Sequence, residues 1–383
     1  MTLPEILSNE TLRQREFPVA QQSVYLAHAG VSPLPRRVAE AIHQYATECT
    51  GGDQETGPAA TRIHETRVLA ARLLRARPEE IALVGPTSLG LSLVAAGIKT
   101  APGQNVLIHF DDYPSNVYPW MALAERGVDV RFLPVREFGC IRVEDVLAQV
   151  DGQTRLVALA SAHFLSGWRL ALATLGRELR ERGILFCVDG IQTLGAFPTT
   201  VEHVDFLAAD AHKWLLGPCG AGILYVRREL QEQLRPFALG WHNVRCPGFV
   251  AQAAIEFQPD ARRYEAGTHN LLGVVGLHAA LRLIEELGVE STAAELTAKR
   301  RRLVGALQSR GYSVLNPEPP PGRESGITSA WREGADLAPV QARLAEARIL
   351  VSLRTDRAGR NYLRFSPHAY NTDAELDRAL ALL

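Results

Sequence analysis

The chain has 383 residues, a net charge of −1 and 46% apolar residues, so it is long enough for a large core and more than one domain. This charge balance offers no basic surface to nucleic acid or an anionic membrane, and no apolar run approaches the roughly 18 residues of a spanning helix. The charged N-terminus lacks a signal-peptide core and the five cysteines show no paired spacing, so we expect a cytoplasmic protein with reduced thiols. The histidines show no ligand spacing, and we predict no metal site.

Two turns of small residues come early in the chain, each ahead of a helix. The first is HAGVSPLP at residues 28–35, and the second is GPTS at residues 85–88, after a strand predicted at residues 80–84. The second turn favours an anion, because the amides at a helix N-terminus are unpaired and the helix dipole is positive there. Thr87 or Ser88 could equally cap that helix, so phosphate binding and simple capping both stay open.

Short apolar runs alternate with helical segments through the middle of the chain. Runs of strand length lie at residues 106–110, 128–135, 156–160 and 184–188. This alternation predicts an α/β fold with a mostly parallel, doubly wound sheet. From about residue 291 the pattern changes to helix, strand, loop, strand and helix, which predicts a smaller C-terminal α+β domain.

The stretch at residues 186–227 holds the residues on which the functional prediction depends. Asp189 ends a strand, where ligands bind in open α/β sheets, and Lys213 follows the next apolar run. Around pyridoxal phosphate, a lysine forms a Schiff base with the aldehyde and a carboxylate keeps the ring nitrogen protonated. Taken singly, Asp189 could cap a helix and Lys213 could be a surface charge. Their order together with Gln192 and the later Gly-Pro pair favours pyridoxal phosphate.

This stretch reads VDGIQ, then Asp210, then HKWLLGPCGAG, and it resembles the class V aminotransferase and cysteine desulfurase-like family of pyridoxal phosphate enzymes. The likeness continues from Tyr25 to Thr372. It implies fold type I, with a large α/β domain at residues 18–270 built on a mostly parallel sheet of the seven-stranded type. Residues 1–17 and 271–383 would form the small domain, as an N-terminal arm plus a C-terminal α+β unit.

The resemblance also implies a cofactor site, position by position. Lys213 would be the Schiff-base lysine and Asp189 the partner of the ring nitrogen, and both would be catalytic. His163 would lie near the ring hydroxyl with Gln192, although a histidine at a strand end can equally be only hydrogen-bonded. The predicted cofactor-binding residues are Thr87, Ser88, Tyr113, His163, Asp189, Gln192, Asp210, His212, Lys213 and Thr268.

Substrate contacts and a partner follow from two further matches. Arg364 opens a stretch similar to the family's RxSxxxYNT motif, and a guanidinium suits a planar carboxylate bidentately. His28, Ala29 and Gly30 would lie over the same substrate carboxylate. Thr268 ends RYEAGT, which is similar to a motif that reaches the phosphate of the opposite subunit, and this implies a homodimer with shared active sites. A surface ion pair for Arg364 and a helix cap for Thr268 are the alternatives.

The reaction is predicted from two residues that the family's desulfurases carry and this chain lacks, a loop cysteine and a histidine. Residues 351–361, which match their cysteine-bearing loop, contain no cysteine, and Tyr113 stands where they place histidine. The first prediction is therefore transamination at the α-carbon of a small amino acid. A carbon–sulfur lyase is the second prediction, with epimerisation as a further alternative, and a pyridoxal phosphate-binding sensor is the non-enzyme alternative. A nucleotide-binding oxidoreductase is disfavoured, because residues 85–90 do not supply a GxGxxG turn.

Overall fold

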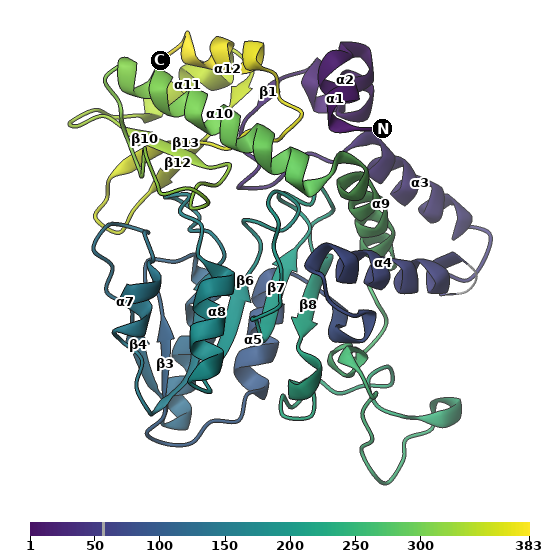
Figure 1. The fold of residues 1–383 in the computed structure, drawn as a ribbon. Coiled ribbons are helices and arrows are strands. Elements are labelled where there is room, and N and C mark those ends of the chain that lie inside the picture. The colour runs from purple at the N-terminus through teal and green to yellow at the C-terminus, as the bar shows by residue number, and fades with distance from the viewer. Residues whose placement is uncertain (56–57) are drawn as a thin grey trace.

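The computed structural model describes residues 1–55 and 58–383 of the chain (Figure 1). Residues 56–57 belong to a loop predicted at residues 50–58 and lie outside the described residues. Within the described ranges, no helix combines the length and the apolar character needed to cross a membrane.

A seven-stranded sheet forms the centre of the larger unit, in the order β2-β8-β7-β6-β5-β3-β4. Among the described strands of this sheet, β8 alone runs antiparallel to its neighbours. The predicted α/β fold with a mostly parallel sheet is therefore confirmed. The strands are β2 (Ile81–Val84), β3 (Asn105–Ile108), β4 (Asp129–Phe132), β5 (Thr154–Ala160), β6 (Leu185–Asp189), β7 (Phe206–Asp210) and β8 (Gly222–Val226).

Helices cover both faces of this sheet, so its central strands are buried along their whole length. Side chains of β6 alternate between the two faces: Phe186 and Val188 enter one core cluster, while Leu185 and Cys187 enter the other. The first cluster includes side chains of α4 (Pro58–Leu74), α8 (Leu172–Glu181) and α9 (Leu271–Leu287), and the second includes those of α5 (Thr87–Gly97) and α6 (Tyr118–Met121).

One close approach fixes the position of α5. A Cβ atom at Gly90 would lie 2.8 Å from the Cβ of Ala208 on β7, so only glycine lets the helix come this near to the strand. The first turn of α5 is thereby held beside the carboxyl end of β7.

A smaller antiparallel sheet, in the order β12-β13-β10-β9, lies above the carboxyl ends of the large sheet (Figure 1). Its strands are β9 (Ser313–Val314), β10 (Thr328–Trp331), β12 (Ser352–Thr355) and β13 (Asn361–Phe365). The helices α10 (Val289–Ser309), α11 (Ala338–Glu346) and α12 (Asp373–Leu380) accompany it, and the Thr372–Glu375 capping box starts α12. This arrangement confirms the α+β pattern predicted after residue 291.

The N-terminal segment joins both units. The strand β1 (Val24–Tyr25) pairs in parallel with β11 (Ile349–Leu350), and Leu26 enters the core cluster of the smaller unit. In contrast, α9 packs against α3 (Arg36–Glu48) and α4 of the larger unit. The predicted division at residues 18 and 270 stays a prediction.

The remaining elements are short. The helices α1 (Leu3–Ser8) and α2 (Glu10–Glu16) form the N-terminal arm, and α7 (Val143–Leu147) precedes β5. The 3-10 turns are η1 (Pro18–Gln21), η2 (Pro78–Glu80), η3 (Pro114–Asn116), η4 (Ala122–Arg126), η5 (Arg228–Leu230), η6 (Pro247–Phe249) and η7 (Ala261–Tyr264).

Candidate active site

A cavity of about 660 Å³ opens between the carboxyl ends of the large sheet and the smaller unit. Ligands bind at this place in open α/β sheets. The predicted residues that line it are Ala29, Gly30, Thr87, Ser88, Tyr113, Asp189, Gln192, His212, Lys213 and Arg364. The cavity thus gathers residues that are more than 300 positions apart in the sequence.

Lys213 and Asp189 are both buried in this cavity, and their pKa values are shifted toward each other. Burial lowers the pKa of Lys213 to about 8; the charge of Asp189 opposes this shift, and the charges of Arg364 and Arg354 add to it. Burial, followed by the charge of Asp112, raises the pKa of Asp189 to about 7. A buried amine that loses its proton near neutral pH can act as a nucleophile and as a base.

Asp210 shapes the loop that carries Lys213. Its carboxylate accepts hydrogen bonds from the backbone amides of Ala211 (2.8 Å), Gly220 (3.1 Å) and Ala221 (3.0 Å), and it contacts Nδ1 of His212 at 2.7 Å. Asp210 does not line the cavity, although we predicted it to bind the cofactor. Its observed contacts position the neighbouring residues of the loop.

The turn before α5 has the properties of an anion site. Pro86 is the N-cap residue, and no side chain caps the first turn of the helix. The hydroxyl of Thr87 accepts the Asp210 amide at 2.9 Å, so it is not a cap, and Ser88 lies at the cavity wall. The capping alternative is thereby removed for both residues, while the helix N-terminus remains available to a phosphate.

The residues predicted around the ring divide into two groups. Tyr113 is 47% exposed at the cavity wall, and Nζ of Lys213 lies 5.2 Å from the centre of its ring. Gln192 also lines the cavity; its amide accepts from Trp214 at 2.9 Å and donates to the Ala29 carbonyl at 3.2 Å. His163 does not line the cavity. Its ring contacts the Asp111 carbonyl (3.0 Å) and the Ser166 amide (3.0 Å), and burial lowers its pKa to about 4.

Arg364 supplies a buried positive charge on the side of the smaller unit. It is 1% exposed, Nη1 donates to the Phe164 carbonyl at 2.8 Å, and Nε has no partner among the described residues. Burial, with a contribution from the charge of Arg354, lowers the pKa of Arg364 to about 9. A buried guanidinium with no carboxylate partner in the described chain is suited to the carboxylate of a substrate.

The N-terminal turn meets this arginine through Gly30 rather than through His28. A Cβ atom at Gly30 would lie 3.6 Å from Nη2 of Arg364. His28 is fully buried away from the cavity, where its ring contacts the Ser366 carbonyl (3.0 Å) and the Tyr370 hydroxyl (2.9 Å). His28 is therefore not placed to touch a ligand in the cavity.

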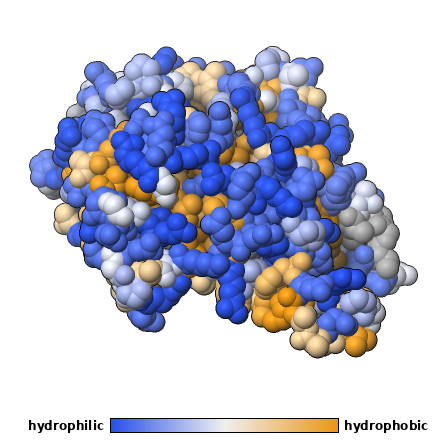
Figure 2. All heavy atoms as spheres, turned by 60° about the horizontal axis from the view of Figure 1, so that its bottom comes forward, coloured by the Kyte–Doolittle hydropathy of each residue, from blue (hydrophilic) through white to orange (hydrophobic). Residues whose placement is uncertain are grey.

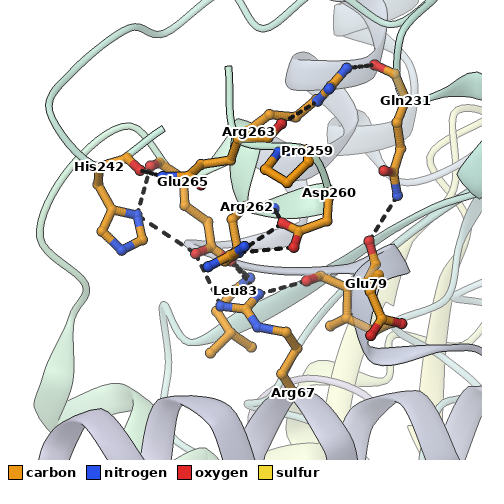
Figure 3. Close-up of polar contacts among 12 residues, drawn as sticks. Arg67, Glu79, Leu83, Gln231, His242, Pro259, Asp260, Arg262, Arg263 and Glu265 are labelled. Carbon is orange, nitrogen blue, oxygen red and sulfur yellow. Dashed lines mark hydrogen bonds and ion pairs between the residues drawn. The ribbon is translucent and has the colours of Figure 1, made fainter. Parts of the chain in front are cut away.

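Thr268 lies outside the cavity that holds Lys213. It borders a separate cavity of about 230 Å³ that Glu265 also lines. Figure 3 shows the polar contacts of this buried Glu265 with Arg67 and His242. The Glu265 carboxylate accepts from Arg67 (2.6 Å), the Leu83 amide (2.7 Å) and His269 (2.9 Å). Burial alone would raise the pKa of Glu265, but the hydrogen bonds from His269 and Arg67 hold it at about 2.

The same region brings together three side chains whose types can bind metals, which the sequence spacing did not indicate. The ligand atoms of His242, Glu265 and His269 lie within 4.8 Å of one another. Arg67 already binds both oxygens of this carboxylate, at 2.6 and 3.2 Å. A cation there would meet the guanidinium, so the cluster is better explained as an ion-pair network.

Several cavity residues were absent from our sequence prediction. They include Tyr25, Phe164, Ser352 and Arg354. Arg354 is one of several arginines in residues 354–364, and nothing in the sequence separates it from its neighbours. The pairing of β12 with β13 places it. This pairing sets Ser352 opposite Arg364, and Arg354, two residues further along the strand, points to the same face of the sheet.

The cavity fits pyridoxal phosphate. Lys213 is suited to the aldehyde and Asp189 to the ring nitrogen. The ring of Tyr113 can lie against the face of the cofactor, and the open N-terminus of α5 can hold the phosphate. The fold and these residues define the class of the protein, the pyridoxal phosphate-dependent enzymes of fold type I.

Comparison with known proteins then identifies the family. The class V aminotransferase family matches residues 24–379, and the chain belongs to it. A probable cysteine desulfurase of Methanothermobacter thermautotrophicus is 31% identical over 286 residues, which cover 72% of this chain and 70% of that protein. A cysteine desulfurase of Klebsiella pneumoniae is 31% identical over 312 residues, covering 77% of this chain and 76% of the relative.

Solved structures show the same fold. The apo structure of a cysteine desulfurase from Thermococcus onnurineus has a TM-score of 0.89 and 25% identity, and the match covers 100% of this chain and 97% of that one. The cystine C–S lyase C-DES, in complex with its product cysteine persulfide, has a TM-score of 0.85 at 23% identity, covering 95% and 98% of the two chains. This protein is thus an enzyme of the class V family, and its cofactor is pyridoxal phosphate.

Proposed function

We propose that this enzyme is a carbon–sulfur lyase that cleaves the bond between the β-carbon and sulfur of a small amino acid by β-elimination. The similar proteins named as cysteine desulfurases support carbon–sulfur cleavage over the transamination that we predicted first. These relatives therefore favour our second prediction from the sequence, a carbon–sulfur lyase.

The observation that carries this proposal is the position of the cysteines. All five lie in the described part of the chain, and none of them lines the cavity. Burial raises the pKa of Cys140 to about 12 and raises that of Cys187, so neither thiol is a ready nucleophile. A desulfurase that takes sulfur onto its own thiol needs a cysteine at the site. Here the sulfur would leave with the substrate fragment.

The residues of the cavity support each part of such an elimination. Bound there, pyridoxal phosphate accepts the electrons released when a proton leaves the substrate α-carbon. Arg364 holds the α-carboxylate, and Lys213 takes the α-proton because its lowered pKa of about 8 leaves roughly a tenth of the amine neutral at pH 7. The Cβ–S bond then breaks, its electron pair leaves with sulfur, and Lys213 returns a proton to the departing thiolate. Water hydrolyses the released 2-aminoacrylate to pyruvate and ammonia.

Product analysis tests the proposal. The holoenzyme is incubated with cysteine, cystine, S-methylcysteine, alanine and aspartate. We expect pyruvate and ammonia in equal amounts from the sulfur-containing substrates, together with sulfide from cysteine, methanethiol from S-methylcysteine and cysteine persulfide from cystine. Lys213→Ala should abolish pyruvate formation, while Cys246→Ala, which changes a thiol outside the cavity, should leave it unchanged.

The other reactions give different products. Transamination would give a keto acid that keeps the sulfur and would release no ammonia, and epimerisation would give the D-amino acid. Either product without pyruvate would overturn the lyase proposal.

A further inference from the structure

A cavity of about 220 Å³ lies at the start of α8, and we call it the α8 cavity. It shares no lining residue with the cavity that holds Lys213. Backbone hydrogen bonds tie its wall to the turn of Asp189. The Ser161 amide donates to the Asp189 carbonyl at 2.8 Å, and the Thr193 amide donates to the Gly190 carbonyl at 3.1 Å. Ser161 and Thr193 line the α8 cavity, whereas Asp189 lines the active site.

The first turn of α8 has unpaired backbone amides at this cavity. Ala171 is the N-cap residue, and no side chain caps the helix. In the described chain, the amides of Ala173 and Thr174 have no hydrogen-bond partner, and both residues line the cavity. Free amides and the helix dipole favour an anion at such a place. A helix N-terminus can equally be solvated, so the surrounding side chains decide whether a ligand is expected.

Ser161 is a buried polar side chain without a partner. It is 1% exposed and lines the α8 cavity, and its hydroxyl makes no hydrogen bond to any residue that the structure describes. Buried hydroxyl groups are normally hydrogen-bonded, because a buried group without a partner has lost its contacts with water and gained none in return. A ligand in the cavity would supply the missing partner.

Two guanidiniums complete the wall of the cavity. Arg169 precedes α8, and Arg323 lies in the loop before β10 of the smaller unit. Arg169 donates from Nη2 to the Gly322 carbonyl at 2.9 Å, while its Nε has no partner within the described ranges. Neither arginine forms an ion pair there. Burial lowers the pKa of Arg169; the charge of Glu324 opposes this shift, and the charge of Arg323 adds to it. Two partly buried positive charges side by side favour an anion between them.

We propose that the α8 cavity binds a tetrahedral oxyanion, either inorganic phosphate or the phosphoryl group of a small ester. The free amides of α8, the hydroxyl of Ser161 and the guanidiniums of Arg169 and Arg323 donate to it, and a phosphoryl group has several acceptor oxygens for them. The ligand joins the two units of the fold, because Arg169 belongs to the larger one and Arg323 to the smaller one. The site lies outside the catalytic cavity and does not depend on the lyase function.

Calorimetry with the holoenzyme tests this site, because the bound cofactor already occupies the phosphate position at α5. The titrants are inorganic phosphate, glycerol phosphate and acetate. We expect saturable binding of phosphate or its ester, and weaker binding of acetate, which has fewer acceptor oxygens. Ser161→Ala and Arg169→Gln should each weaken this binding by about tenfold or more, the loss expected for hydrogen bonds to a charged group. The control Arg177→Gln changes an exposed arginine on α8 and should leave it unchanged.

Two further measurements separate ligand binding from other roles. Urea unfolding without phosphate should show that Ser161→Ala is at least as stable as the wild type, because the hydroxyl has no partner to lose. This variant keeps the test decisive even where Arg169→Gln does not fold. Arg364→Gln should keep the affinity for phosphate, since Arg364 lies in the other cavity.

The order of affinities identifies the source of the oxyanion. Tighter binding of glycerol phosphate assigns the site to a phosphate ester, and tighter binding of inorganic phosphate assigns it to the free ion. No saturable binding of either at millimolar concentration would overturn the proposal. Unchanged affinity in Ser161→Ala, loss of binding in Arg364→Gln, or acetate bound as tightly as phosphate would also overturn it.

Discussion

At the scale of single residues, Lys213 and Asp189 show how burial prepares a side chain for chemistry. Removal from water disfavours the charged form of each group, so the pKa of the amine falls to about 8 and that of the carboxyl rises to about 7. Both groups can therefore change protonation near neutral pH. A cofactor with a basic ring nitrogen would meet Asp189 and share its proton.

The pKa of Lys213 predicts how cofactor attachment depends on pH. Only the neutral amine attacks an aldehyde, so the attachment rate of apoenzyme and pyridoxal phosphate should rise with pH, with a midpoint near 8. Arg354 lowers the pKa of Lys213, and Arg354→Gln should move this midpoint to higher pH. Stopped-flow absorbance of the bound cofactor measures the rate. A midpoint that stays at the ordinary value of a lysine would contradict the assignment, and Arg357→Gln is the control for a general change of charge.

At the scale of elements, the contact between α5 and β7 holds the first turn of the helix beside the loop that carries Lys213. Gly90 makes this contact possible, whereas Gly305 on α10 has open space around its Cα. The two positions therefore form a matched pair for the same substitution inside a helix.

Replacement of Gly90 by alanine should destabilise the protein by about 1–3 kcal/mol, because the new methyl group overlaps Ala208 and shifts the helix. The shift should also weaken phosphate binding at the N-terminus of α5. Gly305→Ala should stabilise the protein by about 0.5–1 kcal/mol through helix propensity. Urea unfolding and equilibrium dialysis of pyridoxal phosphate measure both effects. Equal stability changes in the two variants would show that the contact does not constrain the helix.

Glu265 links a helix, a strand and a loop, and its ionisation predicts an acid-dependent stability. It binds Arg67 on α4 and the backbone of Leu83 on β2 (Figure 3), and it also contacts His269. Its pKa in the fold, about 2, lies below the ordinary value of 4.5. The stabilisation is therefore fully present above about pH 4.5 and is lost as the pH falls through about 2.

Glu265→Gln should cost about 3–5 kcal/mol at neutral pH, because it leaves the buried Arg67 without its carboxylate. It should also flatten the loss of stability between about pH 4.5 and 2. Denaturant unfolding at several pH values measures both effects. The control is Glu285→Gln, since Glu285 forms an exposed pair with Arg72 and should change stability by less than about 1 kcal/mol. A loss near 3 kcal/mol in both variants would contradict this explanation.

At the scale of the whole molecule, the position of Thr268 bears on assembly. It lies outside the cavity of its own chain, so the contact that the resemblance implies would be with the cofactor in the cavity of a second copy. Exposed apolar side chains lie nearby in sequence, at Phe237, Leu239, Trp241, Phe249, Val250 and Ile255. Figure 1 shows residues 236–257 projecting below β8, and Figure 2 shows an apolar patch at one edge of that end of the molecule. We propose that a second copy covers this patch in a homodimer.

Mixing two inactive or weakened variants tests whether the sites are shared. Lys213→Ala and Thr268→Ala homodimers are combined and allowed to exchange subunits. If Thr268 acts across the interface, one site of each heterodimer has both residues, and the mixture should gain lyase activity over the Thr268→Ala protein alone. Analytical ultracentrifugation should show a dimer for the wild type, and Phe249→Glu should weaken it. A monomeric wild type, or no gain on mixing, would count against shared sites.

Local patterns in the chain were enough to predict the alternation of strands and helices, the α/β class and the pyridoxal phosphate family. Lys213 and Asp189 could be predicted as site residues because each lies next to a strand end within one short segment. Within such a segment, the spacing along the sequence largely determines where the residues lie in the fold. The capping box at Thr372 and Glu375 is a local feature of the same kind, since both partners lie within one helical turn.

Contacts between distant segments needed the tertiary structure. Arg354 could not be told from its neighbours until the register of β12 and β13 set it beside Arg364 at the cavity. His28 and His163 lie in segments that resemble the family, yet both rings are buried and hydrogen-bonded outside the cavity. The sequence by itself determined which chemistry the chain can carry, because residue types and local spacing are written in it. Only the tertiary structure decided which charges remain unpaired at the site, because pairing and burial depend on residues that are far apart along the chain.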